Sequence, residues 1–309
     1  MTRALLAIGA AAVAAMATRW TTASLIPATR TLRRNHRGVP VPTGLGVAVL
    51  AGITAGVAFI ALVRAIAPHS PTPAIALAGS FGVLILGFGF GTFGLGSDVA
   101  APHERGWRAH FPALAKGNLT PPAFAIAGGG MLALVIGAAT SSSFGWALAN
   151  AAIIALMAGL FGALDVRPGR AGKAYLVAVV PLTILGKGLM VPLAATLGAV
   201  AAFLAYDLRE RAMLGDAGAN ALGAIAGGAI VAVDPPAWFV LTLLAALVAL
   251  NGATDGPGLS TWIDRISPLR SFDRLGRVPD APEMGGGSRP VDRNPGDGNP
   301  GGGGGELLH

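Results

Sequence analysis

The chain has 309 residues, of which 53% are hydrophobic and 12% are charged, with a net charge of +7 and no cysteine. Soluble domains carry about 25% charged residues, so this composition excludes an ordinary water-soluble globule. The lack of cysteine excludes disulfides, zinc–thiolate sites and thiol nucleophiles. The basic residues lie in short loops between apolar blocks, which is typical of membrane orientation signals, so nucleic acid is not an expected partner.

Long apolar blocks follow one another along the chain, and several approach the ~20 residues needed to cross hydrocarbon. The first block is interpreted as a retained span and not as a signal peptide, because eight further blocks follow it. The sixth and seventh blocks are separated by a turn at Gly186-Lys187. We therefore expect an all-α polytopic membrane protein with about nine transmembrane helices, at residues 4–26, 43–63, 73–96, 121–140, 145–164, 174–186, 188–206, 217–233 and 236–251.

Basic residues concentrate in every second connection between these blocks. The loops after the first, third, fifth and seventh blocks, and the segment after the ninth, hold most of them, whereas the opposite connections are short and nearly free of positive charge. Positive loops stay on the cytoplasmic side of a membrane. The pattern predicts an outside N-terminus and a cytoplasmic C-terminus.

The segment after the ninth block is amphipathic. Over residues 260–278, apolar residues recur mostly at three-residue spacing among Asp and Arg, which predicts a helix on the inner membrane surface, bent at Pro268. The alternative is a loop folded against the protein, since proline disfavours a continuous helix. Residues 279–309 are rich in Gly and Pro and are predicted to form a disordered tail after a 1–278 transmembrane domain.

Three loops on the predicted cytoplasmic side each contain an aspartate that could take part in catalysis or ligand binding. Asp216 lies among glycines at a helix start, where the backbone can approach a phosphate and the carboxylate can bind Mg²⁺, although aspartate is also a common N-cap. Asp165 precedes two arginines around a Pro-Gly turn. The arginines could bind a nucleotide phosphate, or the segment could be an ordinary cytoplasmic loop. Asp98 begins a loop of mixed charge. This loop could belong to a catalytic or binding site, or it could be a solvated loop at the membrane interface with a Trp anchor.

Five segments, taken in order, carry a resemblance to a known family: Asn35–Gly46, Arg105–His110, Leu164–Arg170, Gly215–Asn220 and Ile266–Arg277. Together they resemble the polyprenyl-phosphate N-acetylhexosamine-1-phosphate transferases, the MraY and WecA type of glycosyltransferase family 4. The resemblance covers about residues 20 to 278, and Gly215-Asp216-Ala217-Gly218 is its most specific motif. These bacterial inner-membrane enzymes use Mg²⁺ to move a sugar-1-phosphate from a UDP-sugar to a polyprenyl phosphate, at a site on cytoplasmic loops.

The resemblance implies roles for particular residues. Asp216 would be the Mg²⁺ ligand, Asp165 the nucleotide-pocket aspartate, and Arg37 would face the lipid phosphate or diphosphate. Asp98 is the nearest carboxylate to the family's catalytic loop. The resemblance further implies binding roles for Arg167, Arg170, Asn220 and His110. Partners would be a UDP-sugar, polyprenyl phosphate and membrane lipid, and a homodimer is one oligomeric state that the sequence allows.

The chain departs from the family at its central acidic pair. Thr92 and Phe93 occupy the two aspartate positions, and Gly159 and Gly162 replace the family's paired asparagines before the third motif. Phosphoryl transfer depends mainly on positioning and on charge neutralisation by the metal, so this loss should weaken catalysis.

Two functions therefore stay open. One is a transferase with a rearranged site built from Asp216, Asp165 and Asp98. The other is a catalytically inactive protein that binds the lipid carrier or regulates envelope assembly. A solute transporter is the weakest reading, because the spans hold almost no ionisable residue at mid-depth.

Overall fold

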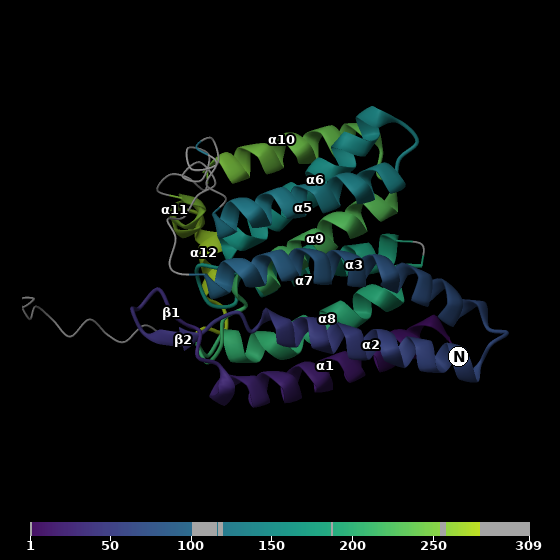
Figure 1. The fold of residues 1–309 in the computed structure, drawn as a ribbon, viewed down its shortest axis with the longest axis horizontal. Coiled ribbons are helices and arrows are strands. Elements are labelled where there is room, and N and C mark those ends of the chain that lie inside the picture. The colour runs from purple at the N-terminus through teal and green to yellow at the C-terminus, as the bar shows by residue number, and fades with distance from the viewer. Residues whose placement is uncertain (1, 101–115, 117–119, 187, 254–257, 279–309) are drawn as a thin grey trace, which may run out of the picture. The chain divides into compact units, whose positions relative to one another are not determined.

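The computed structural model describes residues 2–100, 116, 120–186, 188–253 and 258–278. The predicted binding residue His110, the Arg105–His110 segment and the 279–309 tail lie outside this part of the chain. The described residues form α-helices and one two-stranded hairpin (Figure 1). Element labels follow Figure 1.

A helix overlaps each of the nine predicted apolar blocks. The bounds of these helices are α1 (Arg3–Ala28), α2 (Gly46–Ile66), α3 (Pro71–Val99), α5 (Pro121–Ala139), α6 (Phe144–Leu164), α7 (Arg170–Leu185), α8 (Met190–Asp207), α9 (Gly215–Val233) and α10 (Ala237–Ala253). Seven described helices are long and apolar enough to cross a membrane, namely α1, α2, α3, α5, α6, α8 and α9. The helices α7 and α10 are shorter, with 16 and 17 residues. The described chain therefore has the make-up of a multi-pass membrane protein, since a helix satisfies its own backbone groups in lipid.

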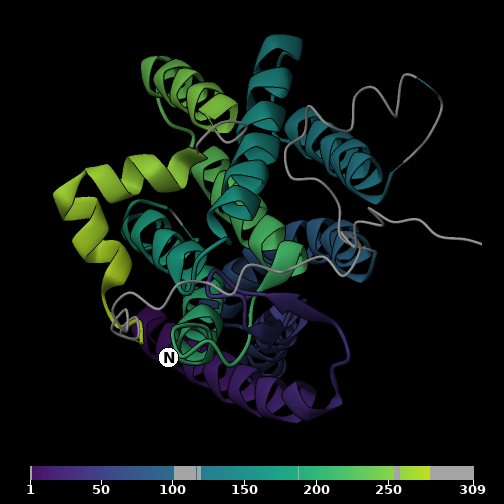
Figure 2. The same cartoon turned by 90° about the vertical axis from the view of Figure 1, so that its left-hand side faces the viewer.

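Helix α9 is the most enclosed element of the bundle. It packs against α2, α3, α6 and α7, and most of its side chains are buried. Around it, α1 packs against α2 and α8, and α6 packs against α5 and α10. Figure 2 looks roughly along the helices and shows this arrangement end-on. The first turn of α9 therefore lies where several helix ends and loops can reach it.

The contact between α2 and α9 depends on two glycines. A Cβ added at Gly46 would overlap the backbone of Gly218, and one added at Gly218 would approach the Cα of Gly46 to 2.7 Å. Small residues of this kind allow two helix backbones to approach closely in membranes. The Gly46 amide also donates to the Leu214 carbonyl at 2.9 Å, which ties the start of α2 to the start of α9.

The basic loop after α1 forms a short hairpin of β1 (Leu32–Arg34) and β2 (Pro40–Pro42). The strands are antiparallel, with Leu32 opposite Pro42. The Met213 amide donates to the Pro42 carbonyl at 2.8 Å, and the Leu45 amide donates to the Met213 carbonyl at 3.2 Å. The hairpin is thus fixed to the connection between α8 and α9, next to the first turn of α9.

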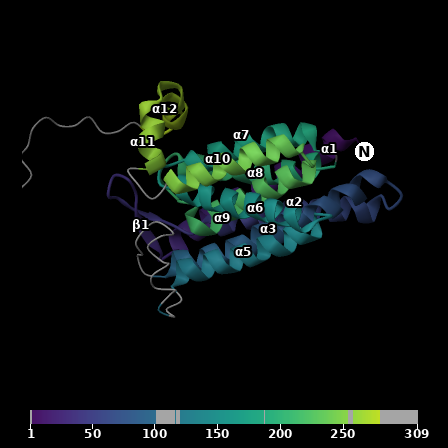
Figure 3. The same ribbon diagram turned by 90° about the horizontal axis from the view of Figure 1, so that it is seen from above.

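The predicted surface helix at 260–278 is two helices, α11 (Gly258–Arg265) and α12 (Ser267–Arg274). The break falls at Ile266, which precedes α12 as its N-cap, and not at Pro268. Pro268 occupies the first turn of α12, where its missing N–H has no intrahelical partner to lose, so the predicted position of the bend was wrong. Figures 1 and 3 place α11 and α12 at the same end of the bundle as the hairpin. This end, marked by Asp98, Asp165 and Asp207, is called the inner end below, a name that refers to its place in the bundle and to no side of a membrane.

Candidate functional site

The first turn of α9 is the point at which the predicted acidic residues meet. Gly215 begins α9 with φ +70°, a conformation that favours glycine. A side chain at this position would also lie 2.5 Å from Oδ2 of Asp98. Glycine is therefore required both by the backbone conformation and by the neighbouring carboxylate.

Asp98, from the last turn of α3, caps α9 from a different helix. Its Oδ1 accepts a hydrogen bond from the Asp216 amide and its Oδ2 accepts one from the Ala217 amide, both at 2.9 Å. The residue is only 6% exposed. The first N–H groups of a helix lack intrahelical acceptors and carry partial positive charge, so they favour a carboxylate. Both oxygens of Asp98 are thus engaged in holding the start of α9.

Asp165 and Ser97 complete the arrangement around this turn. Asp165 follows the last residue of α6, and its Oδ2 accepts a hydrogen bond from the Gly215 amide at 2.9 Å. The Ser97 hydroxyl donates to Oδ2 of Asp216 at 2.8 Å. Asp98, Asp165 and Asp216 therefore converge, as the resemblance implies, but two of the three carboxylates bind backbone amides of α9.

The positions of the missing acidic pair serve packing. Phe93 makes an edge-to-face contact with Phe124 of α5, with ring centroids 5.5 Å apart. The Thr92 hydroxyl donates to the Phe88 carbonyl within its own helix at 2.7 Å. Phe93 therefore supplies a contact between α3 and α5, and the Thr92 hydroxyl is satisfied within α3.

The resemblance places the metal ligand of this turn at Asp216, whose Oδ2 accepts a hydrogen bond from Ser97. Mg²⁺ requires oxygen ligands in near-octahedral geometry. The Asp98 oxygens already accept two backbone hydrogen bonds. Over the described ranges, no three His, Cys, Asp or Glu side chains are grouped so that they could hold a metal ion. No chemical step through Mg²⁺ is derived for this site.

Burial raises the pKa of Asp165 well above its ordinary value, and the carboxylates of Asp207, Asp216 and Asp98 raise it further. The folded protein therefore holds this proton more tightly than the unfolded chain, so stability falls as pH rises through the folded pKa. We expect Asp165→Asn, which mimics the protonated acid and can still accept from Gly215, to be more stable than wild type at pH 8. This advantage should shrink towards pH 5 in thermal unfolding scans; an advantage that does not change with pH would contradict this origin.

Removing the Asp98 cap should destabilise the start of α9. We expect Asp98→Ala to lower the free energy of unfolding by about 2 kcal/mol, because two buried amides lose their acceptor. Asp98→Asn retains one acceptor oxygen and should lose about half as much. Thermal unfolding of the purified protein measures both, and an alanine variant as stable as wild type would show that Asp98 is no cap.

The arginines predicted to bind substrate are paired with carboxylates of the chain itself. Arg37 forms an ion pair with Glu210 at 3.1 Å and donates to the Val278 carbonyl at 2.7 Å. Arg167 binds Asp264 through two hydrogen bonds of 3.0 and 2.8 Å. Arg170 binds Asp273 through two hydrogen bonds of 2.9 Å. These pairs connect the inner-end loops to one another and to α11 and α12.

The two glycines of α6 that replace the family's asparagines leave room for other amides. A Cβ at Gly162 would lie 2.7 Å from Oδ1 of Asn220, and one at Gly159 would lie 2.9 Å from Oδ1 of Asn251. Asn251 also donates to the carbonyls of Leu156 and Leu247 at 3.1 and 2.9 Å. The predicted binding residue Asn220 thus lies against α6, and the role of Asn251 was missed.

Asp207 was also missed by sequence reasoning. It ends α8, is 3% exposed, and accepts a hydrogen bond from the Gly169 amide at 2.9 Å. An aspartate directly after an apolar block is the one signal that could have identified it. With Asp165 and Glu210 it lines a small pocket between the hairpin and the loops before α7 and α9.

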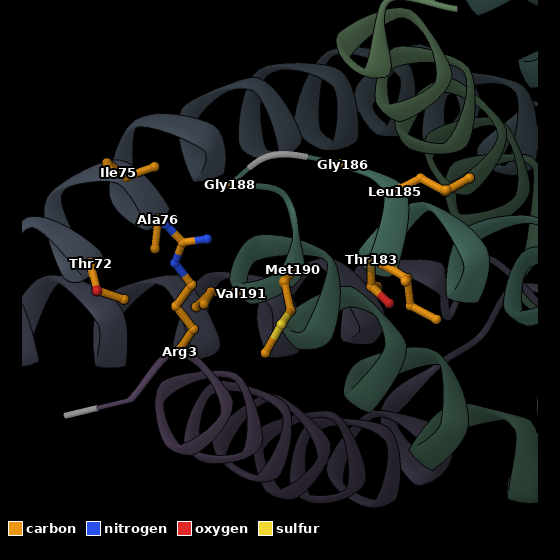
Figure 4. A pocket seen from close by; sticks show the side chains of 11 residues that line it. Arg3, Thr72, Ile75, Ala76, Thr183, Leu185, Gly186, Gly188, Met190 and Val191 are labelled. Carbon is orange, nitrogen blue, oxygen red and sulfur yellow. The ribbon is translucent and has the colours of Figure 1, made fainter.

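A larger pocket, of about 210 Å³, lies at the other end of the bundle. Its walls include Thr72 at the start of α3, Leu185 at the end of α7 and Met190 at the start of α8, and the Arg3 side chain points into it (Figure 4). Because α7 begins at the inner end and ends here, this pocket is separate from the acidic residues of α9.

No family model matches the chain, and no curated protein matches it either. The resemblance to the sugar-1-phosphate transferases therefore rests on the five motifs.

Proposed function

We propose that this chain is a multi-pass protein of the bacterial inner membrane, related to the polyprenyl-phosphate sugar-1-phosphate transferases. It has nine spans, an outside N-terminus and its inner end in the cytoplasm. It binds the phosphate of a polyprenyl carrier and does not transfer a sugar phosphate. The observation that carries this proposal is the capping of α9 by Asp98 and Asp165.

The capping works against phosphoryl transfer at this turn. A helix N-terminus is a natural site for a phosphate, because its free N–H groups point outwards. Here three successive amides, those of Gly215, Asp216 and Ala217, already donate to carboxylates of the chain. An incoming phosphate would have to displace these side chains and would be repelled by the charge of Asp98.

Cationic groups for a lipid phosphate are available at Arg30, between α1 and β1, and at Arg33 in β1. Arg30 and Arg33 form no ion pair within the described part of the chain, and Arg30 is exposed. Both follow the inner end of a helix long enough to span the bilayer. Arginines at this depth attract anionic headgroups.

Binding by these two arginines is tested with the protein in nanodiscs and undecaprenyl phosphate as the probe. Native mass spectrometry should detect one bound lipid, and Arg30→Ala with Arg33→Ala should weaken binding roughly tenfold or more. Arg209→Ala, which removes an exposed arginine of the connection between α8 and α9, is the matched control and should bind like wild type. Equal binding by all three proteins would contradict the assignment.

The catalytic half of the proposal is tested separately. A transferase would convert UDP-GlcNAc and undecaprenyl phosphate into the lipid-linked diphosphate sugar and release UMP. With Mg²⁺ present, we expect UMP release no greater than that of heat-denatured protein. Mg²⁺-dependent release that disappears in Asp216→Asn would replace this proposal with the transferase alternative.

A further inference from the structure

The face of α12 that meets the bundle carries both an acidic residue and apolar side chains. Its one buried residue is acidic, Asp273, which is 4% exposed. Leu269 and Phe272 neighbour Asp273 on the same face of the helix and remain 46% and 43% exposed, and Leu275 after the helix is 65% exposed. Trp262 of α11 is 64% exposed. An apolar surface of this kind marks an interaction site.

The side of α12 that faces the bundle is held by polar contacts. Arg170, at the start of α7, binds both carboxylate oxygens of Asp273 at 2.9 Å. Lys173 donates to the carbonyls of Phe272 and Asp273 at 3.0 and 2.6 Å. The pair of Arg167 and Asp264 adds a link from α11 to the loop after α6. Leu269 and Phe272 lie beside these polar contacts, and their exposed parts can contact a partner at the edge of the bundle.

The charge and position of this surface favour a lipid bilayer as that partner. Helices α11 and α12 lie at the inner end, shortly after the apolar helix α10 along the chain. Three exposed arginines, Arg265, Arg270 and Arg274, accompany the apolar side chains. Apolar and aromatic groups with arginines are typical of helices that lie in the interface of an anionic leaflet. Two copies of this chain meeting through the same surface would instead bring these arginines together.

We propose that α11 and α12 form a membrane-seated clamp. The apolar side chains enter the headgroup region of the inner leaflet, and anionic lipid strengthens this seating through the three arginines. Next to these apolar side chains, Asp264 and Asp273 hold the Val166–Lys173 segment in place. Membrane composition is thereby linked to the order of the loop that contains Asp165. This inference does not depend on the proposed binding of a lipid carrier.

Spin labels test the seating, because the chain contains no cysteine and single-cysteine variants need no further change. Leu269→Cys labels the apolar side, and Ser271→Cys, an exposed polar position of the same helix, is the matched control. In nanodiscs with phosphatidylglycerol, the label at 269 should collide with oxygen and be shielded from a water-soluble nickel chelate, and the label at 271 should show the reverse. A label at 269 that is open to the chelate, or shielded from both reagents by protein, would overturn the proposal.

Hydrogen exchange tests the link to the loop. Residues 166–173 should exchange more slowly in nanodiscs with phosphatidylglycerol than in nanodiscs with phosphatidylcholine alone. The turn at residues 140–143 of the other end should exchange equally in both. Equal exchange of residues 166–173 in the two lipids would overturn the clamp, whatever the outcome of the lipid-carrier and UMP measurements.

Discussion

Replacing Asp273 by Asn is expected to lower the free energy of unfolding by about 3–5 kcal/mol. The variant leaves the Arg170 guanidinium, which is 5% exposed, without its carboxylate partner. Burial alone would raise the pKa of Asp273, but the hydrogen bonds and charge of Arg170, with Arg277 and Lys173, hold it below its ordinary value. The carboxylate is thus ionised at neutral pH, and its contribution to stability is lost only as pH falls below about 4.

Two further variants separate the effect of burial from that of charge. Asp264→Asn breaks the more exposed pair with Arg167 and should cost less than about 1 kcal/mol. Arg170→Met combined with Asp273→Leu replaces the Arg170–Asp273 pair with apolar groups. It should recover only part of the stability, because Arg277 also binds Asp273 and loses this carboxylate. Thermal unfolding of all these variants in the same detergent compares their stabilities. A loss in Asp273→Asn as small as that in Asp264→Asn would contradict a buried, structural ion pair.

The second large effect is expected at the contact between α2 and α9. Gly46→Ala should cost about 3 kcal/mol, at the upper end of the usual cost of overpacking. The new Cβ would overlap the backbone of Gly218 and lie 2.9 Å from the Leu214 carbonyl oxygen. Backbone atoms of two packed helices cannot rotate aside as a side chain can, so the helices must separate.

Gly130→Ala in α5 is the matched control for this variant. The same methyl group is added to a helix, but no other atom lies within 4 Å of it. Alanine is also the better helix former by about 1 kcal/mol. Unfolding temperatures should therefore fall sharply for Gly46→Ala and stay equal or rise for Gly130→Ala. Equal losses in both variants would show that the close approach of α2 and α9 is not required.

The helices could be predicted from sequence because lipid imposes a simple rule on length and polarity. Each apolar block became a helix, since no other open structure satisfies the backbone in hydrocarbon. The side of α12 that faces the protein could not be predicted. Asp273 resembles a water-facing residue of an amphipathic helix, and only its distant partner Arg170, 103 residues earlier, turns it inwards.

The location of the candidate site could be predicted from the sequence, but the roles of its residues could not. The motifs placed Asp98, Asp165 and Asp216 at the ends of apolar blocks, and the structure brings them together at the first turn of α9. The hydrogen bonds that Asp98 accepts from amides 118 and 119 residues away leave no local pattern in the sequence. The same holds for the carboxylates that neutralise Arg37, Arg167 and Arg170, because they come from distant parts of the chain.

The central claim is that carboxylates of the chain close the first turn of α9, so that it is not a metal–phosphate site. Electron paramagnetic resonance of Mn²⁺, which substitutes for Mg²⁺, tests this directly on the protein in uncharged phosphatidylcholine nanodiscs. We predict that wild type and Asp216→Asn give the same spectrum, that of Mn²⁺ in water. A protein-bound Mn²⁺ signal in wild type that is lost in Asp216→Asn would contradict the account.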